Sequence, residues 1–99
     1  MSHTTTHITK KERSNALYQA ILRLETEEEC RSFFEDLCTI SELCSMEQRF
    51  EVAKLLRQGC IYTEIMEKTG ASSATITRVN RCLNYGAEGY RRVLEKLEE

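Results

Sequence analysis

The sequence contains no proline and only four glycines, so almost nothing interrupts helices along its 99 residues. No apolar run approaches the roughly 20 residues that are needed to span a bilayer. The N-terminal stretch MSHTTTHITKKER lacks the apolar core of a secretory signal. The absence of such a run and of a signal predicts a cytoplasmic protein without a membrane partner. The Ser/Thr-rich N-terminus predicts a flexible tail over residues 1–9, and the length of the chain suits one small helical domain over 10–99.

Residues that could carry out catalysis or bind a metal are scarce. The five cysteines form no C-x-x-C pair, and both histidines lie in the N-terminal tail. We therefore expect no zinc site and no disulfide framework, and we interpret the cysteines as small buried hydrophobic residues. The sequence has no paired-carboxylate site, no phosphate-binding glycine loop and no Ser/His/Asp set. It predicts no catalytic residue, no metal and no cofactor.

Charge is distributed unevenly along the chain, although the formal net charge is only −2. Residues 25–51 hold nine acidic side chains and two basic ones. Residues 70–85 hold Arg78 and Arg81 and no acidic side chain at all. An acidic body with a local basic stripe is what a protein needs in order to present one face to a polyanion.

The apolar residues recur at helical spacing throughout, and no useful β-alternation is found. Capping patterns follow Thr26, Thr39 and Ser45, and Gly59 and Gly70 are suited to end helices. The expected helices cover residues 10–24, the segment after Thr26 through Leu37, a short stretch near 40–44, 46–58, 62–69, 73–84 and 87–98. The sequence thus predicts an all-α fold with six or seven short helices.

Residues 62–84 have the layout of a helix-turn-helix, with the turn at Gly70-Ala71-Ser72. Ile65, Ala71 and Ile76 are the small or apolar residues that would let the two helices pack closely. Short side chains at the start of the second helix would let its backbone approach DNA, and arginines further along would reach phosphates or guanines. The predicted DNA-binding residues are Ser72, Ser73, Ala74, Thr75, Thr77, Arg78 and Arg81. A solvated surface helix, or an RNA or protein partner, remains an alternative interpretation of the pattern.

A family resemblance extends this interpretation. Residues 70–78 read GASSATITR and follow a leucine-rich helix that ends KLLRQG; the further stretches are FFEDLCTISEL, QRFEVAKLL and RCLNYG. Together they resemble the Trp repressor family, and more specifically its YerC/YecD-type members, over about residues 28–89. The resemblance implies an intertwined, all-helical homodimer in which each helix-turn-helix addresses half of a palindromic operator. It therefore implies a transcriptional regulator, and in particular a repressor.

The resemblance also implies a candidate effector pocket formed by Gln48, Arg49, Arg78 and Val79. In the Trp repressor two arginines hold tryptophan, and a glycine leaves room for the indole ring. Here Arg78 matches one arginine, Gln48 replaces the other beside Arg49, and Val79 replaces the glycine. Loss of a guanidinium partner for a carboxylate forfeits roughly 1.5–3 kcal/mol. We expect tryptophan not to bind with useful affinity, and whether another small molecule binds is left open.

Two classes of function follow from the sequence. The first is a homodimeric regulator that binds double-stranded DNA through residues 62–84. The alternative is a helical dimeric interaction module, in which the acidic region 25–51 docks another protein and DNA binding is weak or vestigial. An enzyme is not expected.

Overall fold

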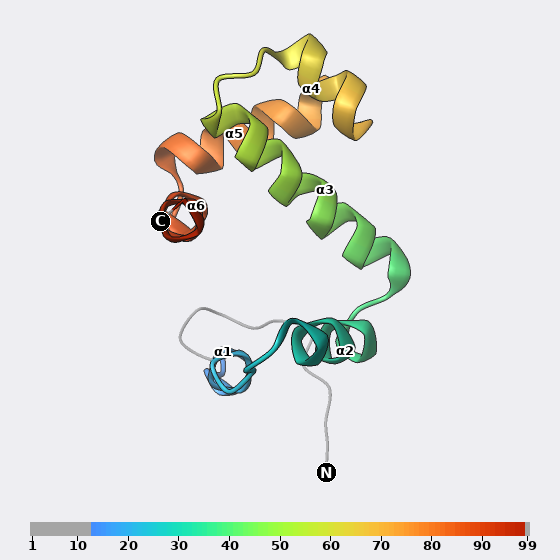
Figure 1. Ribbon diagram of the computed structural model, residues 1–99, viewed down its shortest axis with the longest axis vertical. Coiled ribbons are helices and arrows are strands. Elements are labelled where there is room, and N and C mark those ends of the chain that lie inside the picture. Colours follow the sequence, from blue (N-terminus) through green and yellow to red (C-terminus); the bar gives the residue numbers. More distant parts are fainter. Residues whose placement is uncertain (1–12, 99) are drawn as a thin grey trace. The chain divides into compact units, whose positions relative to one another are not determined.

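The computed structural model describes residues 13–98, which contain six α-helices and no strand (Figure 1). The chain divides between Leu37 and Cys38 into two compact units. The first unit contains α1 (Ala16–Ile21) and α2 (Glu27–Leu37). The second contains α3 (Ile40–Arg57), α4 (Tyr62–Thr69), α5 (Ser73–Tyr85) and α6 (Gly89–Leu97). The predicted all-α class is confirmed, and the predicted tail over 1–9 lies outside the described residues.

Helix α1 is shorter than the helix predicted over residues 10–24, of which residues 10–12 are not described. The Ser14 hydroxyl accepts a hydrogen bond from the Ala16 amide at 2.9 Å and marks the start of the helix. At the other end, the amides of Arg23 and Leu24 donate to carbonyls three residues earlier. Such i−3 bonds tighten the last turn and satisfy carbonyls that would otherwise lack partners, so the helix ends early.

Helix α3 is one continuous helix of 18 residues, where two helices over 40–44 and 46–58 were predicted. Thr39 begins it with the full capping box: its hydroxyl accepts from the Glu42 amide, and the Glu42 carboxylate accepts from the Thr39 amide. The similar pattern after Ser45 lies inside the helix, so the prediction of a helix start there is wrong. Within a helix the backbone amides already donate to carbonyls four residues earlier, and a side-chain cap has no orphan amide to satisfy.

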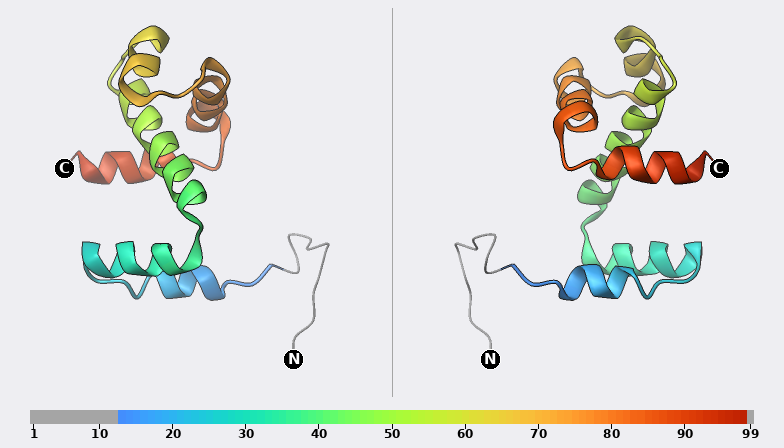
Figure 2. Two further views of the ribbon diagram at one scale, coloured as in Figure 1. Left: turned by 90° about the vertical axis from the view of Figure 1, so that its right-hand side faces the viewer. Right: turned by 90° about the vertical axis from the view of Figure 1, so that its left-hand side faces the viewer.

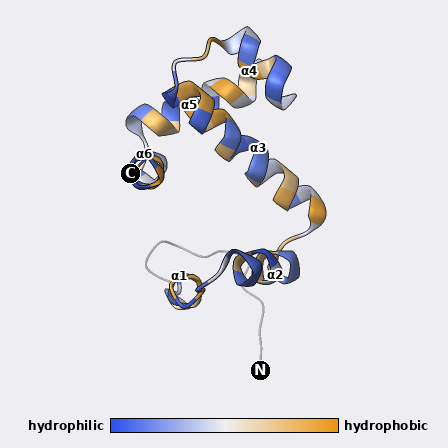
Figure 3. Cartoon of the chain, viewed as in Figure 1, coloured by the Kyte–Doolittle hydropathy of each residue, from blue (hydrophilic) through white to orange (hydrophobic). Residues whose placement is uncertain are grey.

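The second unit has a small hydrophobic core. Helices α4 and α5 lie beside the C-terminal half of α3, and α6 crosses α3 (Figure 2). The buried residues are Val52, Ala53, Leu55, Ile65, Ala71, Ile76, Val79 and Leu94. Hydrophobic residues are visible on each of these helices in Figure 3. Burial of Ile65, Ala71 and Ile76 confirms the predicted contact between the two helices of the helix-turn-helix.

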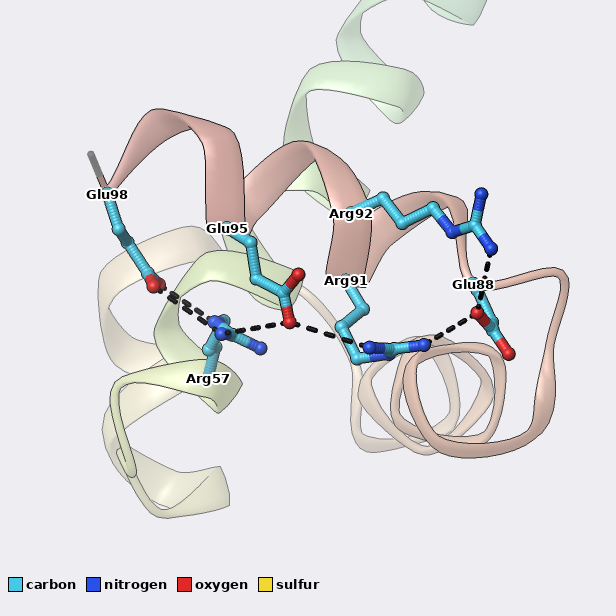
Figure 4. A network of polar contacts seen from close by, with 6 residues as sticks. All are labelled: Arg57, Glu88, Arg91, Arg92, Glu95 and Glu98. Atoms are coloured by element: carbon cyan, nitrogen blue, oxygen red, sulfur yellow. Dashed lines mark hydrogen bonds and ion pairs between the residues drawn. The ribbon is translucent and has the colours of Figure 1, made fainter.

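A network of ion pairs links the C-terminal end of α3 to α6 (Figure 4). Arg57 donates from Nε to Glu98 at 2.8 Å, and its Nη2 lies 3.7 Å from Glu95. Arg91 continues the network to Glu95 and Glu88. The hydrogen bond to the Glu98 carboxylate raises the pKa of Arg57. Exposed ion pairs of this kind each contribute little to the free energy of unfolding.

The cysteines are not buried in the single chain, which corrects the prediction from sequence. Cys30, Cys44 and Cys82 are exposed, Cys38 and Cys60 are half-buried, and all five carry free thiols. Cys82 lines an open groove, and Cys30 belongs to a helix that has no buried residue. Residues 13–98 contain no cluster of three or more side chains suited to holding a metal ion. None of the helices in that range is long and apolar enough to cross a membrane.

Candidate nucleic-acid interface

The turn between α4 and α5 comprises three residues, so the segment has the layout of a helix-turn-helix. Helix α4 ends at Thr69, and Gly70 follows it in the left-handed conformation with φ 74°. Glycine adopts this conformation without the steric penalty that a Cβ would cause. Ala71 is buried against the core, and Ser72 then caps α5. The small residues of the turn therefore let the second helix leave close to the first.

One face of α5 is open to solvent along its first two and a half turns. Ile76 and Val79 point into the core from the opposite side, with 0% and 1% of their surface exposed. Of the seven residues predicted to contact DNA, Thr75 is half-buried and the others are exposed: Ser72, Ser73, Ala74, Thr77, Arg78 and Arg81. The fold thus gathers the predicted residues at the N-terminal end and outer face of one helix.

Two of these predicted residues hold the start of the helix. The Ser72 hydroxyl accepts from the Thr75 amide at 3.1 Å and lies 3.1 Å from the Thr75 hydroxyl, to which it donates. This bond satisfies one of the amides that lack an intrahelical acceptor at a helix start. Ser72 and Thr75 therefore define the N-terminus of α5, while Ser73, Ala74 and Thr77 form its outer surface.

The outer face of α5 is positively charged and carries no carboxylate. Within residues 13–98, neither Arg78 nor Arg81 takes part in an ion pair, whereas arginines on α2, α3 and α6 are paired with glutamates. The first turn of α5 contains no acidic residue. The N-terminal amides of a helix carry partial positive charge, which adds to that of the two arginines. This face is suited to an anionic partner.

The four residues of the candidate effector pocket lie on two helices, Gln48 and Arg49 on α3 and Arg78 and Val79 on α5. Arg49 lines a hollow of about 390 Å³ along the N-terminal half of α3, and none of the other three residues lines it. Arg78 is exposed on α5, and Val79 is fully packed into the core. Gln48 contacts the end of α4. The effector pocket remains a prediction.

One contact of the turn could not be inferred from the sequence. The Gln48 side chain on α3 donates from Nε2 to the Thr69 carbonyl oxygen at 3.1 Å. The two residues are 21 positions apart, and no local pattern connects them. Only the packing of α3 against α4 brings them together, so no sequence signal was available to find this contact.

Comparison with known proteins agrees with this geometry. The family model for the Trp repressor protein matches residues 12–98. The uncharacterized protein YerC of Bacillus subtilis strain 168 is 53% identical over 83 residues, which are 84% of this chain and 80% of YerC. A crystal structure of a TrpR-like protein from Eubacterium eligens is 56% identical, with a TM-score of 0.84 over 91% of this chain and 96% of that one.

A second crystal structure, from Staphylococcus aureus, is 46% identical with a TM-score of 0.83, and the match covers 90% of this chain and 92% of that chain. The family model and these relatives each extend over both structural units, so the likeness is not confined to the helix-turn-helix. With its helical fold, its three-residue turn and its matched length, the chain belongs to the Trp repressor protein family.

Proposed function

We propose that this protein is a sequence-specific DNA-binding transcriptional regulator that represses by occupying an operator. The observation that carries the proposal is the outer face of α5, which is exposed, free of acidic residues and marked by two arginines that no glutamate pairs within residues 13–98. In a helix-turn-helix, the N-terminal residues of the second helix contact base edges in the major groove. Membership in the Trp repressor family supports the same assignment.

Different side chains on α5 can contact the DNA backbone, which positions the helix, and the base edges, which carry the sequence information. Residues three and four apart share a helix face, so Ala74 lies in line with Arg78 and Arg81. Guanidinium groups contact phosphates and can also bind guanine through two hydrogen bonds. The small side chain of Ala74 would let the helix N-terminus approach a phosphate. The operator would thus be recognised by one short helix per subunit.

A homodimer would supply the second reading helix and would cover apolar surface that the single chain leaves open. Helices α1 and α2 contain no buried residue, and two leucines at their C-terminal ends are exposed, Leu22 just after α1 by 77% and Leu37 by 50%. Helices of 6 and 11 residues are too short to be stable alone in water, so their packing must come from elsewhere. The second unit carries a complementary feature, an apolar groove of about 460 Å³ whose lining includes Phe50, Tyr90 and Val93.

Sedimentation equilibrium tests this assembly. We expect a mass twice that of one chain at micromolar concentration, because the exposed apolar residues of α1 and α2 are buried only when two chains associate. Val93→Asp, which places a charge in the apolar groove, should shift the protein toward the monomer. Glu67→Lys on the exposed surface of α4, which does not line the groove, is the control, and it should leave the mass unchanged. A monomeric wild-type protein would contradict the dimer.

DNA binding is tested by selecting bound duplexes from a random pool and titrating the selected duplex against a scrambled one. We expect the selected duplex to be palindromic and the protein to bind it at least about a thousand-fold more tightly than the scrambled duplex. Arg78→Ala and Arg81→Ala should each weaken binding about tenfold or more, because a charge-assisted hydrogen bond is lost. For each phosphate contact removed, the slope of log affinity against log salt should become shallower by about 0.9.

Arg31→Ala is the matched control for these arginine variants. It also removes one positive charge, but Arg31 lies on α2 and pairs with Glu27 in an exposed i,i+4 contact. We expect its affinity and salt slope to equal those of the wild type. If no duplex is enriched at low salt, the proposed function is wrong, and the interaction module with the acidic region 25–51 becomes the better hypothesis.

A further inference from the structure

The hydrogen bond from Gln48 to Thr69 reaches the residue on which the geometry of the turn depends. The Thr69 hydroxyl donates to the Ile65 carbonyl at 2.7 Å and accepts from the Ala71 amide at 3.1 Å. Its carbonyl accepts from Gln48 at 3.1 Å. Thr69 thus connects α4, the turn and α3 through three hydrogen bonds. A substitution at Gln48 would therefore alter the hydrogen bonding at the turn, although the residues of the turn itself are unchanged.

The Gln48 amide also lies alongside the left-handed glycine of the turn. A Cβ added to Gly70 would lie 4.0 Å from Nε2 of Gln48, so the side chain runs past the turn at van der Waals distance. The last carbonyls of a helix have no intrahelical partner and need a donor from elsewhere. Gln48 is such a donor for α4, and it is neutral, half-buried and carried by the long helix of the second unit.

The other side of the helix-turn-helix is held by the hydrophobic core. Val79 is 1% exposed on α5, and Ile65 on α4 is fully buried. The turn is therefore fixed on one side by apolar packing and at its edge by the Gln48 amide. Both kinds of contact are made by the protein's own side chains.

We propose that Gln48 is a positioning residue, which holds the turn between α4 and α5 on α3 so that operator binding requires no small-molecule effector. The inference rests on the proposed function where it concerns DNA, but the positioning of the turn can be measured without DNA. A ligand can shift a conformational equilibrium only through a difference in its affinity for the two states. When the protein's own contacts already fix the competent state, little is left for a ligand to shift.

Amide hydrogen exchange of the protein without DNA tests the positioning. Gln48→Met keeps the length of the side chain and removes its donor. The Ala71 amide should exchange about tenfold faster in this variant, since the net loss of one hydrogen bond corresponds to roughly that factor. The amides of Val52 and Ala53 in α3 should be unchanged. Equal exchange at Ala71 in the variant and the wild type would overturn the proposal.

Gln58→Met is the matched control for hydrogen exchange, because Gln58 is exposed at the end of α3. It should leave exchange at Ala71 at the wild-type rate. Gln48→Glu is the second variant, and it replaces the donor with an acceptor that faces the Thr69 carbonyl. Its effect at Ala71 should exceed that of Gln48→Met, whereas a merely space-filling side chain at this position would give the reverse order.

Titration of the selected duplex tests the consequence for DNA. Gln48→Met should lower affinity for the selected duplex several-fold while leaving the scrambled duplex and the salt slope unaffected, because no phosphate contact is lost. Addition of 1 mM L-tryptophan, as the probe of an effector, should change wild-type affinity less than about twofold. A rise of tenfold or more would overturn effector independence. Failure of the wild type to select any duplex would refute the proposed function, while the exchange experiment would still decide the role of Gln48.

Discussion

Ala74→Glu should reduce affinity for the selected operator by about a hundred-fold or more, the largest effect expected of any single change on the outer face of α5. Ala74 is exposed in the first turn of that helix, in line with Arg78 and Arg81. A carboxylate there would face the phosphates, and placing like charges against each other costs several kcal/mol. The comparison is made by titrating the wild type and the variant with the same duplex at one salt concentration.

The same substitution should leave the fold intact or slightly stabilise it. The first turn of α5 contains no acidic residue, and a glutamate near a helix N-terminus interacts favourably with the helix dipole by about 0.3–1 kcal/mol. The variant would therefore bind DNA more weakly while being at least as stable as the wild type, so unfolding could not explain its loss of affinity. Ala74→Gln has the same size as the glutamate variant without the charge, so it measures the cost of the added bulk alone, and it should bind at least tenfold more tightly than Ala74→Glu. If the glutamate and glutamine variants bind equally well, α5 does not face the DNA as proposed.

Ile76→Ala should lower the free energy of unfolding by roughly 3 kcal/mol, the largest effect expected on stability. Ile76 is fully buried, and truncation of such a side chain removes apolar burial and leaves a cavity, typically at 2–5 kcal/mol. Only eight residues of the described chain form the core, so few neighbours are available to fill the space. A domain of this size has a total stability of about 5–15 kcal/mol, and the loss would be a large fraction of it.

Urea denaturation at one fixed protein concentration measures this loss, because the apparent stability of a dimer depends on concentration. Ile61→Ala is the control with the same change of side chain, since Ile61 is 66% exposed just before α4. The free energy of unfolding of Ile61→Ala should lie within about 0.5 kcal/mol of the wild-type value, as for most exposed positions. Equal losses at the two positions would show that Ile76 does not occupy the core of the helix-turn-helix.

The positions of helix ends were largely determined by the sequence itself. The capping pattern at Thr39 and Glu42 forms the hydrogen bonds that it predicts, and Gly70 adopts the left-handed conformation expected at the end of α4. Ser72 caps α5, and its hydroxyl accepts a hydrogen bond from the Thr75 amide three residues later. These features involve side chains and amides within three or four residues of each other, so the local sequence is enough to specify them.

A local capping pattern did not predict a helix start correctly where the pattern lay within a longer helix. Ser45 begins the same kind of motif as Thr39, yet it lies inside α3, in the second turn of the helix. Whether such a serine starts a helix depends on whether the preceding residues are already helical, which the motif does not encode. The cysteines show the same limit, because burial depends on which faces are covered by other helices. Cys30 and Cys44 are exposed although their apolar character suggested otherwise.

The sequence alone determined the all-α class, the helix-turn-helix over 62–84 and the acid-free face of α5, since helical periodicity, glycine punctuation and charge are properties of neighbouring residues. Only the tertiary structure decided what supports that face. It buried Val79 in the core and placed the Gln48 amide on the Thr69 carbonyl. Such contacts join residues about twenty positions apart, and they exist only after α3, α4 and α5 have packed around a shared apolar core.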